Sequence, residues 1–125
     1  MLKTDRLKVP DLVGVKVAFT DRGLALSGTI TAKEPDKVLG IFFRAVHEQV
    51  LAEKLKEISV DVRALTFVNS SAIRLFIDWA IWVSQQKGPT YLLRFIRSPQ
   101  VTWQRISFPP LAQLAWGHLV LEDGV

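Results

Sequence analysis

The sequence predicts a single α/β domain built on an open, mixed sheet of four or five strands. Short segments in which apolar and polar residues alternate, as in strands, are separated by longer segments whose apolar residues recur at helical spacing. Strands that are separated by helices need crossover connections, so the later strands should be parallel. Only the turn Asp21-Arg22-Gly23 joins the first two predicted strands, which should therefore form an antiparallel hairpin at one edge. The expected order is β-β-α-β-α-β-α, with a short strand at the end.

The first part of the chain predicts an arm and the hairpin. Residues 1–14 have no periodicity and are interpreted as an N-terminal arm, whereas residues 15–125 are interpreted as the domain. Alternation predicts strands over residues 15–20 and 24–30, and Gly28 marks a weak point or bulge in the second of them.

The middle of the chain predicts two helices on either side of a central strand. Residues 37–55 form the first helix, because apolar residues recur at Leu39, Phe43, Val46 and Val50. Residues 58–63 alternate as a half-buried strand, residues 64–69 should form a loop, and residues 71–83 are apolar and free of Gly and Pro, as in a helix.

The last part of the chain predicts one more βα unit and a short final strand. Residues 91–96 read as a strand, and residues 100–107 as a short helix that Ser98 caps and that Pro109-Pro110 ends. Residues 118–121 form either a last strand or an extended tail.

The composition argues against several classes of function. The chain has no cysteine, which excludes disulfides and thiolate metal sites. The net charge of +4 comes from lysines and arginines that are spread along the chain, so we expect no nucleic-acid partner. The apolar run over residues 72–83 is too short to span a bilayer, and the charged N-terminus lacks the apolar core of a signal peptide. We therefore expect a cytoplasmic protein with no membrane partner.

The residues that commonly carry chemistry form no recognisable catalytic pattern. His47 and His118 have no partner at metal-ligand spacing, and the glycines form no nucleotide-binding loop. The serines are not part of a nucleophile elbow. We expect no metal, no cofactor and no enzymatic activity.

Two adjacent serines, Ser70 and Ser71, lie where the predicted loop meets the second helix. A serine at this place can cap the helix by accepting from a free N–H group of the first turn. The same N–H groups and the helix dipole also favour an anion, including a phosphate on a serine. The residues leave both interpretations open.

The second helix has more apolar surface than one buried face requires, because its polar residues are essentially limited to Arg74, Asp78 and Gln85. In one interpretation the helix is covered by the third helix and the tail, with Trp103 and Trp116 packed on it. In the other, an exposed patch binds a partner protein or a second copy of the chain. The patch would consist of Phe76, Trp79 and Trp82.

The run from Val60 to Ile73 resembles the STAS domain, the family of anti-sigma-factor antagonists. In that family an apolar strand is followed by Asp-Ser-Ser-Gly and a helix, and here the corresponding residues are Asn69, Ser70, Ser71 and Ala72. The order of the predicted elements, the Leu26-Ser27-Gly28 segment and Lys87-Gly88 before an apolar strand are also similar to the family. Thr31 stands where the family has an acid after the second strand.

The resemblance implies a switch between protein partners. It implies that a serine kinase, an ATPase of the anti-sigma-factor type, phosphorylates Ser70, with Ser71 as the alternative acceptor. The unmodified protein binds its partner, the phosphorylated protein releases it, and a phosphatase resets the switch. The resemblance places Thr31, Thr66 and Asn69 in the switch loop. From helical spacing we expect Arg74 to pair with the phosphate and Ser71 to cap the helix.

Two other functions remain open. The tryptophan-rich helix would serve a scaffold or homodimer that needs no phosphorylation. A pocket at the strand ends, where open α/β sheets bind ligands, would serve a sensor of small molecules.

Overall fold

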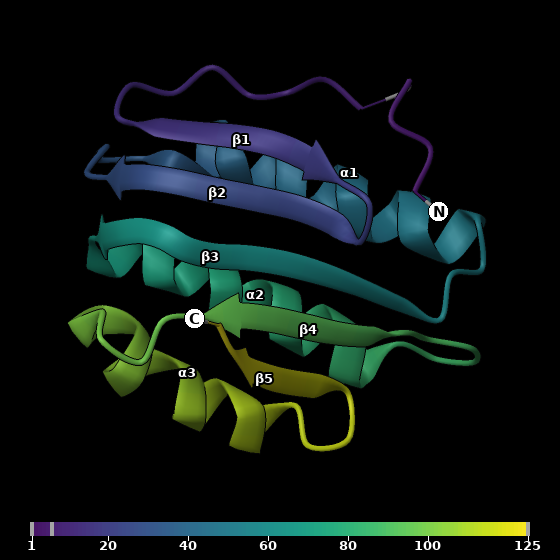
Figure 1. Cartoon of the computed structure of the whole chain (residues 1–125). Helices are drawn as coiled ribbons and strands as arrows, with labels where there is room; N and C mark the ends of the chain where they lie inside the picture. The colour runs from purple at the N-terminus through teal and green to yellow at the C-terminus, as the bar shows by residue number, and fades with distance from the viewer. Residues whose placement is uncertain (1, 6, 125) are drawn as a thin grey trace.

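The computed structural model describes residues 2–5 and 7–124, and within them the chain forms a five-stranded sheet and three α-helices (Figure 1). The element order confirms the predicted α/β class. The strands are β1 (Val15–Thr20), β2 (Gly23–Ile30), β3 (Glu57–Val68), β4 (Leu92–Arg97) and β5 (Leu119–Asp123). The helices are α1 (Leu39–Ala52), α2 (Ser70–Gln85) and α3 (Thr102–Leu114), and a short 3-10 turn, η1 (Pro35–Lys37), precedes α1.

The strands lie side by side in the order in which they occur in the chain, β1-β2-β3-β4-β5. β1 and β2 are antiparallel, as the tight turn between them predicts, and every later neighbour is parallel. Gly23 is needed at the start of β2, because its φ is +147° and a side chain there would collide with the carbonyl of Ser59 in β3.

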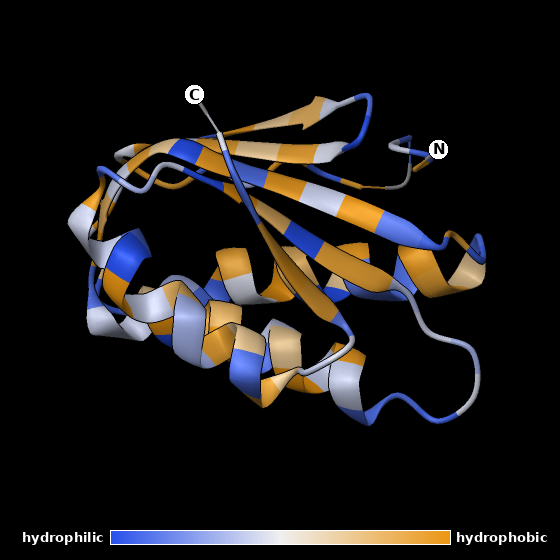
Figure 2. Ribbon diagram, turned by 60° about the horizontal axis from the view of Figure 1, so that its bottom comes forward, coloured by the Kyte–Doolittle hydropathy of each residue, from blue (hydrophilic) through white to orange (hydrophobic). Residues whose placement is uncertain are grey.

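All three helices cover the same face of the sheet (Figure 2). The strand residues that face them are apolar and buried, and so are the large aromatic residues of the helices. The other face carries exposed ion pairs, among them Arg94 with Glu57 at 2.7 Å and Arg22 with Glu122 at 3.2 Å. Exposed ion pairs contribute only about 0–1 kcal/mol each to stability. The stabilising core therefore lies on the helix-covered face, where the apolar side chains are buried. Its fully buried large side chains include Leu24, Leu26, Phe43, Phe76, Trp79, Phe95 and Phe108.

The predicted loop over residues 64–69 is wrong, because β3 continues to Val68. The strand stays paired with β2 as far as Ile30↔Val68, but the register shifts twice, between Ala25 and Ser27 and between Gly28 and Thr29. Each shift breaks the alternation of apolar and polar residues by which a strand is recognised in a sequence. The irregularity predicted at Gly28 is confirmed.

The predicted end of the third helix at Pro109-Pro110 is also wrong, since α3 spans Thr102–Leu114 and contains both prolines. Proline inside a helix costs about 3 kcal/mol or more. Here Phe108 and Leu111, on either side of the prolines, are buried against the core, and each contributes about 1.5–3 kcal/mol of burial. Ser98 does not cap the helix, because the N-cap is Val101.

The residues before β1 lie along the edge of that strand (Figure 1). Leu7 belongs to the core cluster, Leu12 pairs with Val15 through a single bridge, and the Lys3 backbone N–H donates to the carboxylate of Glu53 at 3.0 Å. The arm that the sequence predicts is therefore packed onto the domain.

Among the residues that the structure describes, no helix combines the length and the apolar character that crossing a membrane requires.

Helix α1 ends in a turn that usually contains glycine. The N–H of Leu55 donates to the carbonyl of Val50, and the N–H of Lys54 donates to that of Leu51, which is the hydrogen-bond pattern of a Schellman motif. The residue in the left-handed position is Lys54, with φ +56°. A side chain in this conformation costs about 1–2 kcal/mol relative to glycine.

We expect Lys54→Gly to raise the free energy of unfolding by about 0.5–1 kcal/mol, because relief of the left-handed strain exceeds the extra backbone entropy that glycine loses on folding. Urea denaturation measures the change. Lys56→Gly removes the same charge two residues later, outside the left-handed position, and should not stabilise the protein. Equal stability of Lys54→Gly and the unmodified protein would contradict the strain.

Candidate functional site

Asn69 fixes the junction between β3 and α2, where the sequence places the switch loop. Its side-chain carbonyl accepts from the N–H of Ala72 at 2.9 Å, which makes Asn69 the N-cap of α2. Its side-chain amide donates to the carbonyl of Ala32 at 2.8 Å, and its backbone N–H donates to Ile30 at 3.0 Å. Asn69 therefore ties the start of α2 to the chain that leaves β2. The prediction that Ser71 caps the helix is wrong, because Asn69 takes that position.

Ser70 and Ser71 are the first two residues of α2, and both are exposed. The first turn of the helix contains no acidic residue, so no side chain within it neutralises the positive end of the helix dipole. A negative group on Ser70 would be stabilised there by about 0.3–1 kcal/mol. The site thus offers an accessible hydroxyl where its own domain tolerates an anion.

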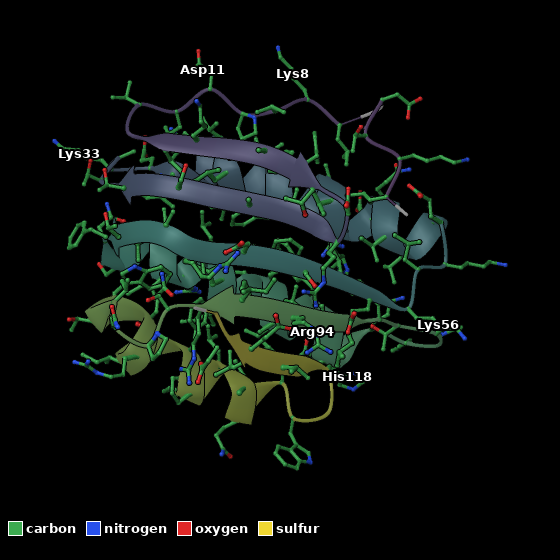
Figure 3. The ribbon with its side chains drawn as sticks, in the orientation of Figure 1. Lys8, Asp11, Lys33, Lys56, Arg94 and His118 are labelled. Carbon is green, nitrogen blue, oxygen red and sulfur yellow. The ribbon has the colours of Figure 1, made fainter. Side chains whose placement is uncertain are left out.

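Two cationic side chains belong to the same end of the molecule. Arg74 lies four residues after Ser70, hence on the same side of the helix, and its Nε is 3.3 Å from Asp78 Oδ1 in an exposed pair that constrains it little. Lys33 is exposed, directly follows Ala32, and lies at this end of the sheet in Figure 3. Thr31 is exposed beside them.

Thr66 makes its hydrogen bond to the neighbouring strand β2 and not to either serine. Its hydroxyl donates to the carbonyl of Gly28 at 3.2 Å, at the second irregularity between β2 and β3. Of the residues predicted for the switch loop, the structure therefore gathers Thr31, Asn69, Ser70 and Ser71 around the helix start.

A groove of about 620 Å³ lies between the end of β3, the first turn of α2 and α3. It arises because β4 pairs with β3 only as far as Asp61, so the rest of β3 has no strand on that side. Two residues of α3 fill the gap: the indole N–H of Trp103 donates to Leu65 at 2.8 Å, and the amide of Gln104 donates to Val62 and Leu65.

The rim of this groove carries two large exposed apolar residues, Phe67 at 50% and Ile106 at 64% exposure. Ile73, next to the two serines, also lines it. Sequence reasoning missed Phe67 because residues 64–69 were predicted as a loop, whereas Phe67 belongs to β3. It missed Gln104 because no sequence spacing identifies this residue as a hydrogen-bond partner of β3. The groove is lined by Thr66, Phe67, Ile73, Gln100, Val101, Thr102, Trp103, Ile106 and Ser107.

The predicted partner patch on α2 is wrong for two of its three residues. Phe76 and Trp79 are 1% and 0% exposed, because α2 lies between α1 and α3 and is covered on both sides. Trp103 stacks on Phe76 with ring centroids 5.8 Å apart, as the alternative interpretation expects, whereas Trp116 is 81% exposed and does not pack. Only Trp82 remains partly accessible, and the Arg44 guanidinium lies 4.9 Å from the centre of its ring.

His47, on α1, is buried inside the protein. The Tyr91 hydroxyl accepts from the Trp79 indole N–H at 2.7 Å and lies 2.7 Å from His47 Nδ1. The tautomer of the imidazole decides which of these two atoms donates in the hydrogen bond between them. Burial lowers the pKa of His47 from 6.5 to about 4 and raises that of Tyr91. Neither group is poised for proton transfer near neutral pH.

Among the described residues, no group of three or more histidine, aspartate or glutamate side chains could hold a metal ion.

We expect Asn69→Ala to lower the free energy of unfolding by about 2 kcal/mol, of which the lost cap contributes about 1 and the carbonyl of Ala32 without its donor about 1. Asn69→Ser keeps a capping oxygen and should cost about half as much. Urea denaturation distinguishes the two variants, and an unchanged stability in Asn69→Ala would refute the double role of this side chain.

We expect the protein to lose stability as the pH falls from about 6.5 toward 4, because His47 stays neutral when folded and takes up a proton when unfolded. At pH 4.5 its contribution amounts to a loss of about 2–3 kcal/mol relative to pH 7. His47→Gln, which cannot titrate, should show a correspondingly smaller fall in urea denaturation curves taken between these pH values. If the stability of the unmodified protein and that of His47→Gln fell equally with pH, the pKa of His47 would not be lowered by folding.

No protein-family model, curated protein or solved structure was found to match this chain. The resemblance to the STAS domain accordingly remains a prediction from the residues that carry it.

Proposed function

We propose that this protein is a non-catalytic regulatory module that binds a protein partner at the groove beside Ser70 and releases it when Ser70 is phosphorylated. The observation that carries the proposal is an exposed serine at the first position of α2, next to an apolar groove and without an acid in its turn of helix. The resemblance to anti-sigma-factor antagonists supports the same function.

The groove supplies the attraction. Phe67 and Ile106 expose apolar surface on its two sides, and water leaves that surface when a partner covers it. A fully buried side chain of this size contributes about 1.5–3 kcal/mol, so a few such contacts suffice for a reversible complex. The groove itself is large enough to accept a side chain of the partner.

The phosphate supplies the release. It adds about −1.5 to −2 charges at neutral pH, and a partner that covers the first turn of α2 would have to remove that charge from water. Within its own domain the phosphate meets the positive end of the helix and the side chain of Arg74, so the fold tolerates it. The modification therefore acts on the interface and leaves the domain intact.

The proposed partners are a serine kinase, an ATPase of the anti-sigma-factor type, and a phosphatase that restores the hydroxyl. Both would act in the cytoplasm. Ser71 is the alternative acceptor, since it is equally exposed and lies in the same turn.

The test begins with protein purified from its native host, whose intact mass and phosphopeptides report any phosphate on Ser70 or Ser71. Host extract and ATP then identify the kinase through loss of phosphate transfer to Ser70→Ala. We expect Ser70→Asp to bind that kinase at least a hundredfold more weakly than Ser70→Ala, which is about 2.7 kcal/mol, as measured by calorimetry.

Two further variants separate the switch from general effects. Gln85→Glu adds one negative charge at the exposed far end of α2 and should leave binding unchanged. Phe67→Ser removes an exposed groove residue and should weaken binding whether or not Ser70 is modified. Equal affinity of Ser70→Ala and Ser70→Asp for the kinase would end the switch hypothesis, and full binding by Phe67→Ser would remove the groove from it.

A further inference from the structure

We propose that a second surface, at the opposite end of the strands, binds an acidic peptide segment of a partner protein that carries a large apolar anchor residue. This surface is separate from the groove beside Ser70. It is a hollow of about 530 Å³ between the ends of α1 and α2 and the starts of β3 and β4, which we call the lysine hollow. Its lining is formed by Leu51, Lys54, Leu55, Lys56, Gln86, Lys87, Pro89 and Thr90.

The lysine hollow combines an apolar lining with a cationic one. Leu51, Leu55 and Pro89 contribute apolar surface, and all three lysines are exposed. No carboxylate lies among the described residues that line it. Figure 3 places Lys56 at the end of the sheet away from Lys33, which belongs to the other site.

The net charge near the lysine hollow is positive even when the neighbouring helix ends and carboxylates are included. Helices α1 and α2 both end here, and the negative ends of their dipoles together contribute about one negative charge. Glu53 lies next to Lys54 and accepts hydrogen bonds from the Lys3 backbone and from Gln49, and Glu57 pairs with Arg94 at 2.7 Å. The three positive charges of the lysines therefore exceed the negative charge of the two helix ends together with that of Glu53.

Lys54 adds an independent observation, since it occupies the left-handed position at the end of α1 at which glycine would be relaxed. The residue with the strained backbone therefore places its ammonium group at the edge of the hollow. Local strain of this kind concentrates at sites that bind something.

The shape of the hollow favours a peptide over a membrane or a small carboxylate. Its volume lies within the range of ligand sites, roughly 300–1,000 Å³, and its apolar residues form a concave surface. A recessed surface accepts a protruding side chain, whereas a bilayer requires apolar groups that project. A single carboxylate would satisfy one lysine, but acidic residues on both sides of an anchor can satisfy all three.

The two sites can be occupied independently. β3 runs from the lysine hollow to the groove, and its 12 residues span about 36 Å. That separation exceeds the Debye length of about 8 Å at physiological salt, so a phosphate on Ser70 has little influence on the lysine hollow.

The experiment uses the full chain and a fluorescein-labelled peptide in which a leucine-phenylalanine pair is flanked on each side by two glutamates. Fluorescence anisotropy is recorded against protein at low and physiological salt. We expect saturable binding, at least tenfold weaker for the triple variant Lys54→Gln, Lys56→Gln, Lys87→Gln, and weaker at the higher salt concentration. The matched control changes Lys8, Lys16 and Lys33, which are also exposed, to glutamine and should bind as the unmodified protein does.

Three further comparisons separate specific docking from general charge, from lost folding and from the switch at Ser70. A peptide with serines in place of the leucine-phenylalanine pair should bind at least tenfold more weakly. Lys54→Gly should bind the original peptide more weakly while its Tm rises, so that lost binding is not a sign of lost folding. Ser70→Asp should bind it unchanged, which keeps this result distinct from that of the switch.

Three results would overturn the proposal. The control variant losing as much affinity as the triple variant would indicate a diffuse charge effect. Equal binding of the serine peptide would show that the apolar floor is not used. Failure of the peptide, together with lysine-dependent sedimentation on vesicles of phosphatidylcholine and phosphatidylglycerol, would assign the surface to membranes instead.

Discussion

The rest of the structure depends on the unequal pairing of β3. The strand is paired with β2 from Ser59 to its end at Val68, but β4 pairs with it only as far as Asp61. The carbonyl groups beyond that point need donors, and Trp103 and Gln104 supply them from α3. One mismatch in strand length thus positions the third helix, opens the groove beside it and exposes Phe67 next to the two serines.

The aromatic residues of α2 pack the three helices and the sheet together. The ring of Phe76 in α2 lies 5.6 Å from those of Phe43 in α1 and Phe95 in β4, measured between centroids, and Phe95 lies 4.8 Å from Phe108 in α3. Rings from all three helices and β4 therefore form one continuous cluster. A helix that is apolar almost all round is expected to be buried, and here it is the central helix of three. The apolar excess of α2 therefore stabilises the fold, and the exposed apolar residues of the groove, Phe67 and Ile106, come from β3 and α3 instead.

Sequence reasoning recovered the class, the hairpin and all three helices, because these depend on periodicities that are local. It failed where distant parts of the chain decide the outcome. The end of β3 was missed because two register shifts erase the alternation, and α3 was cut short because burial of Phe108 and Leu111 overcomes two prolines. At the site, the serines and Asn69 were found from their order alone. The double hydrogen bonding of Asn69 and the partners of His47 and Gln104 required the fold.

The segment along β1 has a consequence for association between molecules. A strand at the border of a sheet presents backbone donors and acceptors to which a strand of another chain can add. Leu7 anchors this segment in the core, Leu12 bridges to Val15, and Gly14 accepts from the N–H of Thr29, so the chain lies along β1 before entering it. The amino-terminal stretch therefore protects this strand against edge-to-edge aggregation. Within the described part of the chain, β5, five residues long and ending in two acids, is the border strand that no further segment pairs with.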